Sequence, residues 1–407
     1  MNQKREIILL NISGDDRPGL TAELTRILAY YKVQILDIGQ AVIHNTLSLG
    51  ILFEVPKECG TSPVLKDLLF KGYEMGLKAK FTPIDEKDYS YWVSLQGKER
   101  YIVTLLGRKI LAVHLSMVSK AISEEGLNID TINRLSGRIS LEESENTMKR
   151  ACVELFVRGT PLSPENMKKQ LMEISRITGI DVAFQKDDVF RRNRRLVCFD
   201  MDSTLIQTEV IVELAKAAGK GDEVHEITEA AMRGELDFQE SFKQRIKLLK
   251  GVKESVLKEI AVNLPITEGA ARLISHLKKF GYKTAILSGG FTYFGNYLKE
   301  VLGIDKVYAN ELEIKNGELT GNYLGEIVDG AKKAELLKKL AFEEGLKLEQ
   351  VIAVGDGAND LPMLSLAGLG IAFHAKPIVK EQAEHSISTV GLDGILYLLG
   401  FRDREIN

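Results

Sequence analysis

The sequence has few of the residues that mark disulfide scaffolds, membrane proteins and secreted chains. Its three cysteines, Cys59, Cys152 and Cys198, lie far apart and follow no metal-ligand spacing, so we expect a reducing cytoplasm and no disulfide framework. No apolar run approaches the ~20 residues that a membrane-spanning helix needs. The residues after Met1 lead into a strand-like run without a signal-peptide core or cleavage site, so neither a membrane anchor nor a leader is expected.

An excess of charge of one sign is also lacking, since 54 basic residues face 57 acidic ones and the formal net charge is -3. This balance gives no field along the whole chain that would attract nucleic acid or an anionic membrane. With 44% hydrophobic and 27% charged residues, the composition is that of folded globular proteins. At roughly 100–200 residues per domain, 407 residues predict two or three domains.

The first half of the chain contains a weak internal repeat. A strand-like run at residues 6–11 is followed by apolar residues at helical spacing between Leu20 and Leu28, and then by two further strands. A second unit of the same kind begins at residue 101 and turns at Gly107. Its helical pattern lies at residues 111–122, and its later strands are expected at 127–132 and 151–157.

Both units resemble ACT domains, which are small ferredoxin-like α+β modules of order βαββαβ that often bind amino acids and regulate metabolic enzymes. The first, at residues 1–86, contains Asp16-Arg17-Pro18-Gly19-Leu20, which resembles the ACT ligand turn. The second, at residues 98–185, has Arg108-Lys109-Ile110-Leu111 instead. The resemblance implies an amino-acid effector at these modules, with serine expected, and the first module is favoured if only one of them binds it. A dimerisation module without a ligand is the alternative.

Two polar segments are interpreted as linkers. Residues 85–97 show little periodicity, and residues 186–195 are mostly charged and end in Arg191-Arg192-Asn193-Arg194-Arg195. A basic run of this kind can bind nucleic acid, but this one is short and lacks interleaved aromatic residues. We therefore expect a solvated linker here and no nucleic-acid partner.

Three apolar runs in the second half each end in a polar loop. Because ligands bind outside the carboxyl ends of buried parallel strands, the three loops are expected to meet. Paired carboxylates tolerate one another where a divalent cation or a phosphoryl group uses them, and bare backbone amides can hold phosphate oxygens. The loops are Asp200-Met201-Asp202-Ser203-Thr204, Ser288-Gly289-Gly290 and Gly355-Asp356-Gly357-Ala358-Asn359-Asp360.

A lysine before the third loop is consistent with a bound anion. Lys332 or Lys333 opens a helical pattern, where a positive charge opposes the helix dipole. Taken one at a time, these features also fit a surface loop, a glycine turn, an Asx turn or a solvated lysine. Their occurrence together and in this order is far more specific.

The ordered motifs D-x-D-x-T, S-G-G and G-D-G-x-N-D resemble the haloacid dehalogenase superfamily of phosphoryl-transfer enzymes. The resemblance implies an α/β domain at residues 195–407, with a Rossmann-like parallel sheet and a helical cap. It implies that Asp200 forms an aspartyl-phosphate while Asp202 donates and then takes a proton. The implied ligands are Mg²⁺ at Asp200, the Asp202 backbone carbonyl and Asp356, and phosphate at Ser288, Gly289 and Lys333, with Asp360 orienting the metal site.

The insert between Asp202 and Ser288, which are 86 positions apart, is too long for a simple connection. Its helical pattern predicts a cap at about residues 209–275, which would exclude water and large substrates and so favours a small metabolite. Within the cap, Glu209 and Arg245 suit the ammonium and the carboxylate of a zwitterion. On the residues alone, a Glu–Arg pair or two solvated side chains is the alternative.

The cap motif S-F-x-x-R together with L-S-G-G-F and G-D-G-A-N-D-L-P-M-L narrows the resemblance to the family that hydrolyses phosphoserine, where fusion to ACT-like modules also occurs. It implies conversion of O-phospho-L-serine to L-serine and phosphate, the final step of serine biosynthesis, in a homodimer. The alternatives are another small phosphate ester as substrate, a phosphotransferase, or an amino-acid sensor. The positions that match the family's phosphoserine contacts are Glu209, Arg245, Ser288, Gly289, Lys333 (favoured over Lys332) and Asn359.

Overall fold

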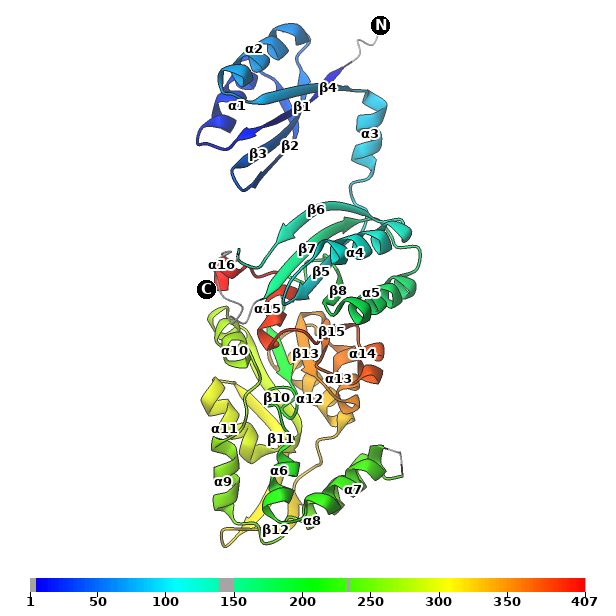
Figure 1. Cartoon of the computed structure of the whole chain (residues 1–407), viewed down its shortest axis with the longest axis vertical. Coiled ribbons are helices and arrows are strands. Elements are labelled where there is room, and N and C mark those ends of the chain that lie inside the picture. The colour runs from blue at the N-terminus through cyan, green and yellow to red at the C-terminus, as the bar shows by residue number, and fades with distance from the viewer. Residues whose placement is uncertain (1–4, 139–149, 233–234, 407) are drawn as a thin grey trace. The chain divides into compact units, whose positions relative to one another are not determined.

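The computed structural model describes residues 5–138, 150–232 and 235–406 of the chain (Figure 1). The chain divides into two compact units, residues 1–98 and 99–407. The first unit is one small α+β module. The second unit contains a similar module followed by a larger domain built on a mostly parallel sheet.

The first unit has the element order βαββαβ. Its strands pair antiparallel in the spatial order β2-β3-β1-β4. Leucines at helical spacing in α1 and α2 are buried, together with alternate residues of β1 and β3, so one core fills the space between helices and sheet. The elements are β1 (Glu6–Asp15), α1 (Leu20–Tyr30), β2 (Gln34–Ile43), β3 (Thr46–Val55), α2 (Thr61–Glu74) and β4 (Lys78–Ile84).

Helix α3 (Glu86–Ser94) follows β4, within the segment interpreted from the sequence as a linker. Asp85 caps its first turn by accepting a hydrogen bond from the backbone amide of Lys87 at 2.9 Å. No residue of α3 is buried, so the helix lacks the apolar stripe from which periodicity is read. The absence of such a stripe explains why the segment shows little periodicity in the sequence.

The second unit begins with a module of the same order. Its strands pair antiparallel in the order β6-β7-β5-β8, which is the order of the first module strand for strand. The two ferredoxin-like α+β modules predicted from the sequence repeat are therefore confirmed. The elements are β5 (Arg100–Gly107), α4 (Ala112–Glu124), β6 (Asn128–Arg134), β7 (Ala151–Arg158), α5 (Pro164–Thr178) and β8 (Asp181–Lys186).

A seven-stranded sheet lies at the centre of the remaining residues. Neighbouring strands pair parallel except β11 and β12, which form an antiparallel hairpin at one edge. The predicted α/β domain with a Rossmann-like sheet is confirmed. In spatial order the strands are β12 (Glu318–Leu324), β11 (Lys306–Lys315), β10 (Lys283–Phe291), β9 (Leu196–Phe199), β13 (Val351–Gly355), β14 (Leu369–Phe373) and β15 (His385–Ile387).

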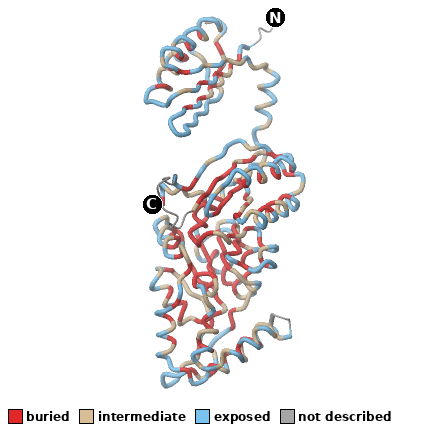
Figure 2. Tube along the Cα trace, in the orientation of Figure 1, coloured by how far each residue is buried: buried red, intermediate tan, exposed pale blue. Residues whose placement is uncertain are grey.

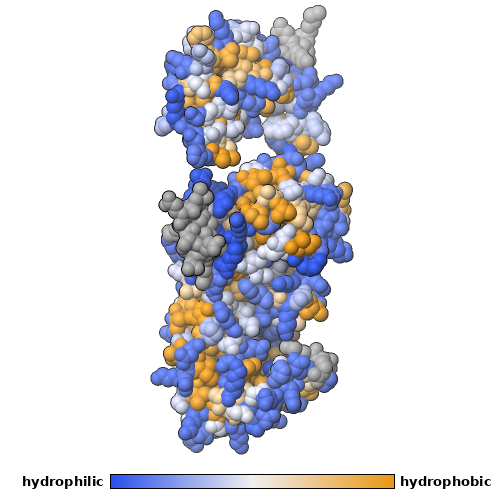
Figure 3. Space-filling model, in the orientation of Figure 1, coloured by the Kyte–Doolittle hydropathy of each residue, from blue (hydrophilic) through white to orange (hydrophobic). Residues whose placement is uncertain are grey.

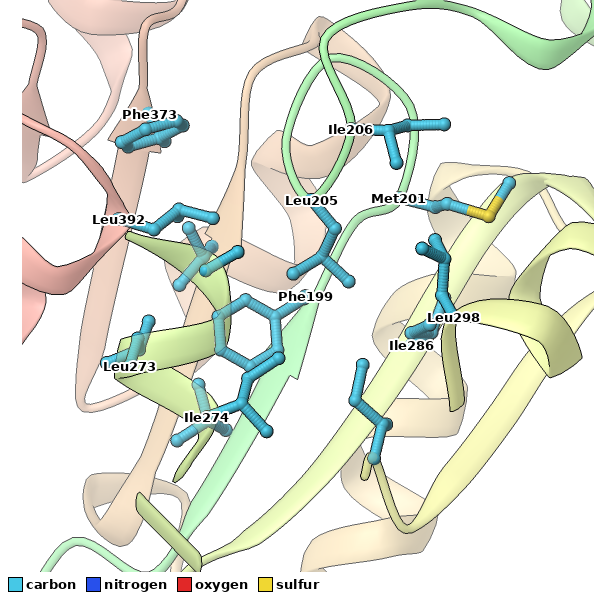
Figure 4. Packing of buried hydrophobic residues seen from close by; sticks show 14 of the residues in the cluster. Phe199, Met201, Leu205, Ile206, Leu273, Ile274, Ile286, Leu298, Phe373 and Leu392 are labelled. Carbon is cyan, nitrogen blue, oxygen red and sulfur yellow. The ribbon is translucent and has the colours of Figure 1, made fainter. Parts of the chain in front are cut away.

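The central strand β9 is buried on both faces. Val197 and Phe199 belong to one core cluster, and Leu196 and Cys198 belong to another. Figure 4 shows the first cluster around Phe199, and Figure 2 shows the buried interior of the domain. Helices α10 (Ala270–Lys279) and α11 (Thr292–Leu302) contribute to the first cluster, and α12 (Gly330–Glu343), α13 (Leu361–Leu366) and α14 (Pro377–Gln382) to the second. Two short helices, α15 (Ile395–Leu398) and α16 (Asp403–Ile406), end the described chain.

Among the described residues, five helices lie between β9 and β10, and the four that precede α10 form the helical insert that the sequence predicted. These four are α6 (Val210–Ala217), α7 (Gly221–Met232), α8 (Phe238–Lys247) and α9 (Glu254–Val262). The segments that enter and leave the insert run next to each other, and an antiparallel bridge joins Ile206 to Ile266. These two segments, which we call the cap linkers (residues 203–209 and 263–269), form the base of the insert.

The second α+β module and the sheet domain share one buried core. Leu106, Cys152 and Ala183 of the module belong to the same cluster as Val197 and Phe199. A common core of this kind gives the two domains a fixed contact, unlike domains that are joined only by a flexible chain.

The basic segment between these two domains is not solvated throughout. Arg191 and Arg194 are only 4% and 5% exposed. Arg191 forms an ion pair with the buried Glu154, and Arg194 donates hydrogen bonds to Gln185 and to the carbonyl of Gly368. The solvated-linker prediction is therefore wrong for these two arginines, because partners from both domains surround them.

The surface and the helix lengths bear on membrane association. Figure 3 shows hydrophilic side chains over much of the face in view, interrupted by hydrophobic patches. The longest helix in the described part of the chain, α5, has 15 residues, whereas a bilayer span needs ~20. The described residues thus contain no helix that could cross a membrane.

Candidate active site

The polar loops predicted to meet do lie at one edge of the parallel sheet. Strand β9 pairs with β10 on one side and with β13 on the other, and Phe199 is in register with both Ile286 and Val354. The polar residues that follow Phe199, Ile286 and Val354 along the chain therefore lie side by side, and those after Ile286 still belong to β10. The backbone amide of Asp200 donates to the carbonyl of Val354 at 2.8 Å, which fixes the start of the first loop.

Asp200 and Lys333 form the centre of the site. Asp200 is 5% exposed, and its Oδ1 accepts a hydrogen bond from the backbone amide of Met201 at 2.8 Å. The Nζ of Lys333 lies 2.8 Å from the same oxygen and 2.7 Å from Oδ1 of Asp360. Burial alone would lower the pKa of Lys333, but the charges of Asp200 and Asp360 outweigh it and the pKa is raised. A permanently charged lysine thus joins two buried carboxylates.

Lys333 reaches this position because of how α12 begins. Asp329 caps the helix and accepts a hydrogen bond from the backbone amide of Lys332 at 2.9 Å. The side chain of Lys332 lies on the outer surface with Glu326 and Glu335, whereas that of Lys333 is fully buried. Of the two lysines left open by the residue pattern, Lys333 is the one that contacts Asp200.

Three carboxylates gather around the lysine. Asp200, Asp356 and Asp360 each offer an oxygen, and these oxygens lie within 4.8 Å of one another. Burial and the charges of Asp200 and Asp360 raise the pKa of Asp356 to about 7. The single positive charge of Lys333 cannot balance three ionised carboxylates, so this oxygen-rich cluster suits a hard divalent cation.

The side chain of Asp202 lies apart from that cluster. Its Oδ1 accepts a hydrogen bond from the backbone amide of Val210 at 3.1 Å, in the first turn of α6. The surrounding protein and the neighbouring charge of Asp200 raise the pKa of Asp202 well above its ordinary value. A raised pKa favours the protonated form of a carboxyl group, which is the form that a general acid needs.

Ser288, Gly289 and Gly290, which the sequence placed in a loop, lie in the last part of strand β10, beyond the residues that pair with β9. The hydroxyl of Ser288 is buried and accepts a hydrogen bond from the amide of Gly290 at 2.9 Å. A β-carbon at position 290 would lie 2.6 Å from Oδ2 of Asp202, so only glycine leaves room for that carboxyl group. This part of β10 and Asp202 are therefore in direct contact.

Two supporting residues were not predicted from the sequence. Asn310 on β11 is 1% exposed; its Nδ2 donates to the Gly289 carbonyl at 2.7 Å and its Oδ1 accepts from the Val328 amide at 2.8 Å. The hydroxyl of Thr204 lies 3.4 Å from Oδ1 of Asp356. Thr204 was within the D-x-D-x-T motif but carried no role, whereas Asn310 lies in a strand pattern that gives no signal of its partners.

Glu209 and Arg245 belong to the cap. Glu209 precedes α6 and is exposed, and Arg245 on α8 is partly buried, with its Nε donating to the Ser241 carbonyl at 3.3 Å. Burial lowers the pKa of Arg245, while the charges of Glu209 and Asp202 oppose that shift. In the described part of the chain no ion pair joins Arg245 to Glu209, so its guanidinium can accept an anionic partner.

The cap approaches the site closely. A β-carbon at Gly289 would lie 3.1 Å from the ring of Phe238 at the start of α8. The side chain of Gln239 donates to Asp329, the capping residue of α12, at 3.1 Å. Asn359 lies in the turn η2 (Ala358–Asp360), and its carbonyl packs against Gly330 at the start of α12. The cap thus contacts both the Ser288–Gly290 segment and the start of α12.

Comparisons with known proteins agree with this organisation. Models described as ACT domain match residues 6–82 and 100–185, and a model described as haloacid dehalogenase-like hydrolase matches residues 197–365. A crystal structure of a probable phosphoserine phosphatase from Vibrio cholerae aligns with a TM-score of 0.59 and 35% identity, over 75% of this chain and 87% of that one.

Two relatives match over almost the whole length. The phosphoserine phosphatase of Streptomyces coelicolor is 41% identical over 403 residues, which are 98% of this chain and 93% of the relative. Phosphoserine phosphatase SerB2 of Mycobacterium tuberculosis is 37% identical over 400 residues, covering 98% of this chain and 94% of the relative. The chain therefore belongs to the phosphoserine phosphatase family, with two ACT domains preceding a haloacid dehalogenase-like hydrolase domain.

Proposed function

We propose that the protein hydrolyses O-phospho-L-serine to L-serine and phosphate, which is the final step of serine biosynthesis. The observation that carries the proposal is the buried Asp200, which Lys333 holds beside Asp356 below a cap that presents Arg245. A protein that only senses amino acids would not need a buried carboxylate such as Asp200 paired with a buried lysine such as Lys333. The full-length likeness to phosphoserine phosphatases supports the substrate.

In the proposed reaction, a carboxylate oxygen of Asp200 attacks phosphorus opposite the serine oxygen. An aspartyl-phosphate bond forms as the bond between phosphorus and the serine oxygen breaks, and Asp202 gives that oxygen a proton. Asp202 then takes a proton from water, which attacks the aspartyl-phosphate and releases phosphate and free Asp200. The raised pKa of Asp202 suits both of these proton transfers.

The oxygen-rich cluster suits Mg²⁺, which Asp200, the backbone carbonyl of Asp202 and Asp356 would hold. When bound, Mg²⁺ would supply the positive charge that lets a carboxylate approach a phosphate dianion. Asp360 accepts hydrogen bonds from Lys333 at 2.7 Å and from the Gly357 amide at 3.0 Å, so it would orient the third loop and leave the ligand oxygens to its neighbours.

The remaining site residues would bind the two ends of the substrate. Ser288, the Gly289 amide and Lys333 would hold phosphate oxygens, and Asn359 would contact the substrate from the turn that follows β13. In the cap, Glu209 would bind the ammonium group and Arg245 the carboxylate. Phosphoserine is a small phosphate monoester that carries both groups.

The proposed domain limits are 1–86 and 98–185 for the ACT-like domains, 195–407 for the phosphatase domain, and about 209–275 for the cap. We propose that the ACT-like half pairs two subunits into a homodimer and that serine binds the turn at residues 16–20. A cytoplasmic location fits the three free cysteines, of which Cys152 and Cys198 are buried. Calorimetric titration of the full chain with serine tests the effector, and absence of binding would refute it.

A panel of small phosphate esters tests the substrate. O-phosphoethanolamine lacks the carboxylate that Arg245 would bind, and 3-phosphoglycerate lacks the ammonium that Glu209 would bind. Because each missing charged contact is worth roughly 1.5–3 kcal/mol, kcat/KM for phosphoserine should exceed that of either analogue by about 10- to 100-fold. Equal rates would refute the substrate, and transfer of phosphate to an added alcohol in preference to water would indicate a phosphotransferase.

A further inference from the structure

The second ACT domain reaches the base of the cap through the turn where the first carries its Asp-Arg-Pro-Gly sequence. Arg108 lies directly after β5 and donates two hydrogen bonds to the carboxylate of Glu268, from Nη1 at 2.8 Å and from Nη2 at 2.6 Å. The side chains of Arg108 and Glu268 are 43% and 26% exposed. The hydrogen bond from Arg108 holds the pKa of Glu268 below its usual value, so the pair stays charged at neutral pH.

Glu268 lies in the cap linker that leaves the cap. The neighbouring amide of Thr267 donates to the carbonyl of Leu205 at 2.9 Å, and the amide of Gln207 donates to the carbonyl of Pro265 at 2.8 Å. Together with the bridge between Ile206 and Ile266, these bonds hold the two cap linkers as a short antiparallel pair. The chain enters and leaves the cap through this pair of segments, so the pair sets the angle at which the cap joins the sheet domain.

The same pair is bonded to the catalytic loop. The amides of Leu205 and Ile206 both donate to the carbonyl of Met201, at 2.9 and 3.1 Å. Met201 lies between Asp200 and Asp202, and Figure 4 shows its side chain near those of Leu205 and Ile206. Hydrogen bonds, together with the backbone between Glu268 and Thr267, therefore connect Arg108 through the cap linkers to the nucleophile loop.

A second arginine of the same ACT domain acts on the segment beside Glu268. The carbonyl of Glu268 accepts a hydrogen bond from the amide of Leu392 at 2.8 Å, and the next residue, Asp393, is fully buried. Asp393 forms ion pairs with Arg150 of the ACT domain and, at 2.9 Å, with Arg272 of α10. The cap linker that leaves the cap is thus held by the Arg108–Glu268 ion pair and by a backbone hydrogen bond from Leu392, whose neighbour Asp393 is fixed by two arginines.

We infer that Arg108 is a positioning residue of the phosphatase: through Glu268, the second ACT domain holds the cap linkers in register with the catalytic loop. The inference rests on the proposed function for its effect on turnover, but not for its effect on the linkers. It assigns the turn at residues 108–111 to contact with the cap, in place of the ligand role expected for the corresponding turn of the first domain.

The test replaces Arg108 with alanine in the full chain and measures amide hydrogen exchange and steady-state kinetics. Loss of the pair should speed exchange at Thr267 and Gln207 by about tenfold, which corresponds to ~1.4 kcal/mol of linker stability. If the cap closes less often, a smaller fraction of the enzyme molecules is able to bind substrate. KM for phosphoserine should therefore rise three- to tenfold while kcat changes less than twofold. The charge exchange R108E/E268R should rebuild the ion pair and bring both the exchange rate and KM most of the way back to the wild-type values.

Arg176 supplies a matched control, because it makes the same two-bond contact with Glu173 on α5 but touches no cap linker. R176A should leave exchange at Thr267 and KM unchanged. Equal amide hydrogen exchange rates and equal KM values in R108A and R176A would overturn the inference. It would also be overturned if R108E/E268R brought neither the exchange rate nor KM back toward the wild-type value. If the wild-type chain does not hydrolyse phosphoserine yet R108A still speeds linker exchange, the proposed function fails and the structural part of the inference stands.

Discussion

Replacement of Lys333 by methionine tests whether the lysine charge is needed to stabilise the buried carboxylates of the site. Methionine keeps most of the volume of the lysine stem but removes the charge between Asp200 and Asp360. The side chains of Lys333 and Asp360 are fully buried and that of Asp200 is 8% exposed, so water cannot solvate the carboxylates left behind. The change should therefore destabilise the catalytic domain far more than the loss of a surface ion pair.

The expected magnitude follows from that burial. Removing one partner of a buried ion pair costs about 3–5 kcal/mol, whereas an exposed pair is worth about 0–1 kcal/mol. At about 2 °C per kcal/mol for a domain of this size, K333M should lower the melting temperature of the catalytic domain by ~6–10 °C. K332M is the matched control, because Lys332 lies on the surface with Glu326 and Glu335 and should shift it by less than ~2 °C.

The loss of stability in K333M should depend on pH in a defined direction. In the wild type the pKa of Lys333 is raised above its unfolded value, so its contribution is fully present at every pH below the unfolded pKa, including pH 5–8. In K333M the unpaired carboxylates have a higher pKa in the folded than in the unfolded state. The folded variant therefore takes up protons more readily, and its deficit should shrink as the pH falls from 8 to 5.

Differential scanning calorimetry of the full chain, in the presence of a chelator, measures these shifts. The chelator prevents a divalent cation from replacing the missing charge. Equal melting temperatures for K333M and K332M, or a K333M deficit that grows as the pH falls, would refute the reasoning.

Three further predictions concern the site and the interface between domains. G290A should lower kcat about 100-fold, because its β-carbon would lie 2.6 Å from Asp202 Oδ2 and displace the acid by ~1 Å; G39A, with nothing within 4 Å, is the control. R245A should reduce kcat/KM about 10- to 100-fold for phosphoserine but not for O-phosphoethanolamine. Burial lowers the pKa of His385 to about 3, so stability should fall as the pH drops from ~6.5 toward 3, by up to ~1.4 kcal/mol per unit, and H385Q should flatten this slope in calorimetry.

Much of the site could be predicted because its chemistry is local in sequence. Each group of polar residues directly follows an apolar run, and the rule that parallel strands end at one edge is enough to bring Asp200, Ser288 and Asp356 together. The β11–β12 hairpin also has a local signal in the sequence, because Asn-Gly favours a tight hairpin turn. Asn316 and Gly317 adopt the positive φ angles of 54° and 77° that such a turn requires.

What the sequence did not reveal depends on contacts between distant segments. Arg191 and Arg194 look like a solvated basic run, and only the fold places Glu154 and Gln185 around them. Asn310 gives no local signal because its two partners, the Gly289 carbonyl and the Val328 amide, lie 21 and 18 positions away. Residues that act by joining two separate loops have no periodicity or motif of their own.

The central claim is that this chain hydrolyses phosphoserine through Asp200. The most direct test measures phosphate release from O-phospho-L-serine with Mg²⁺, for the wild type, for D200N and for the exposed control D37N. We expect turnover by the wild type and D37N and a loss of at least about 10⁴-fold in D200N, because an amide oxygen is too weak a nucleophile to form the acyl-phosphate. Activity of D200N within tenfold of the wild type would contradict the mechanism, and an inactive wild type would contradict the function.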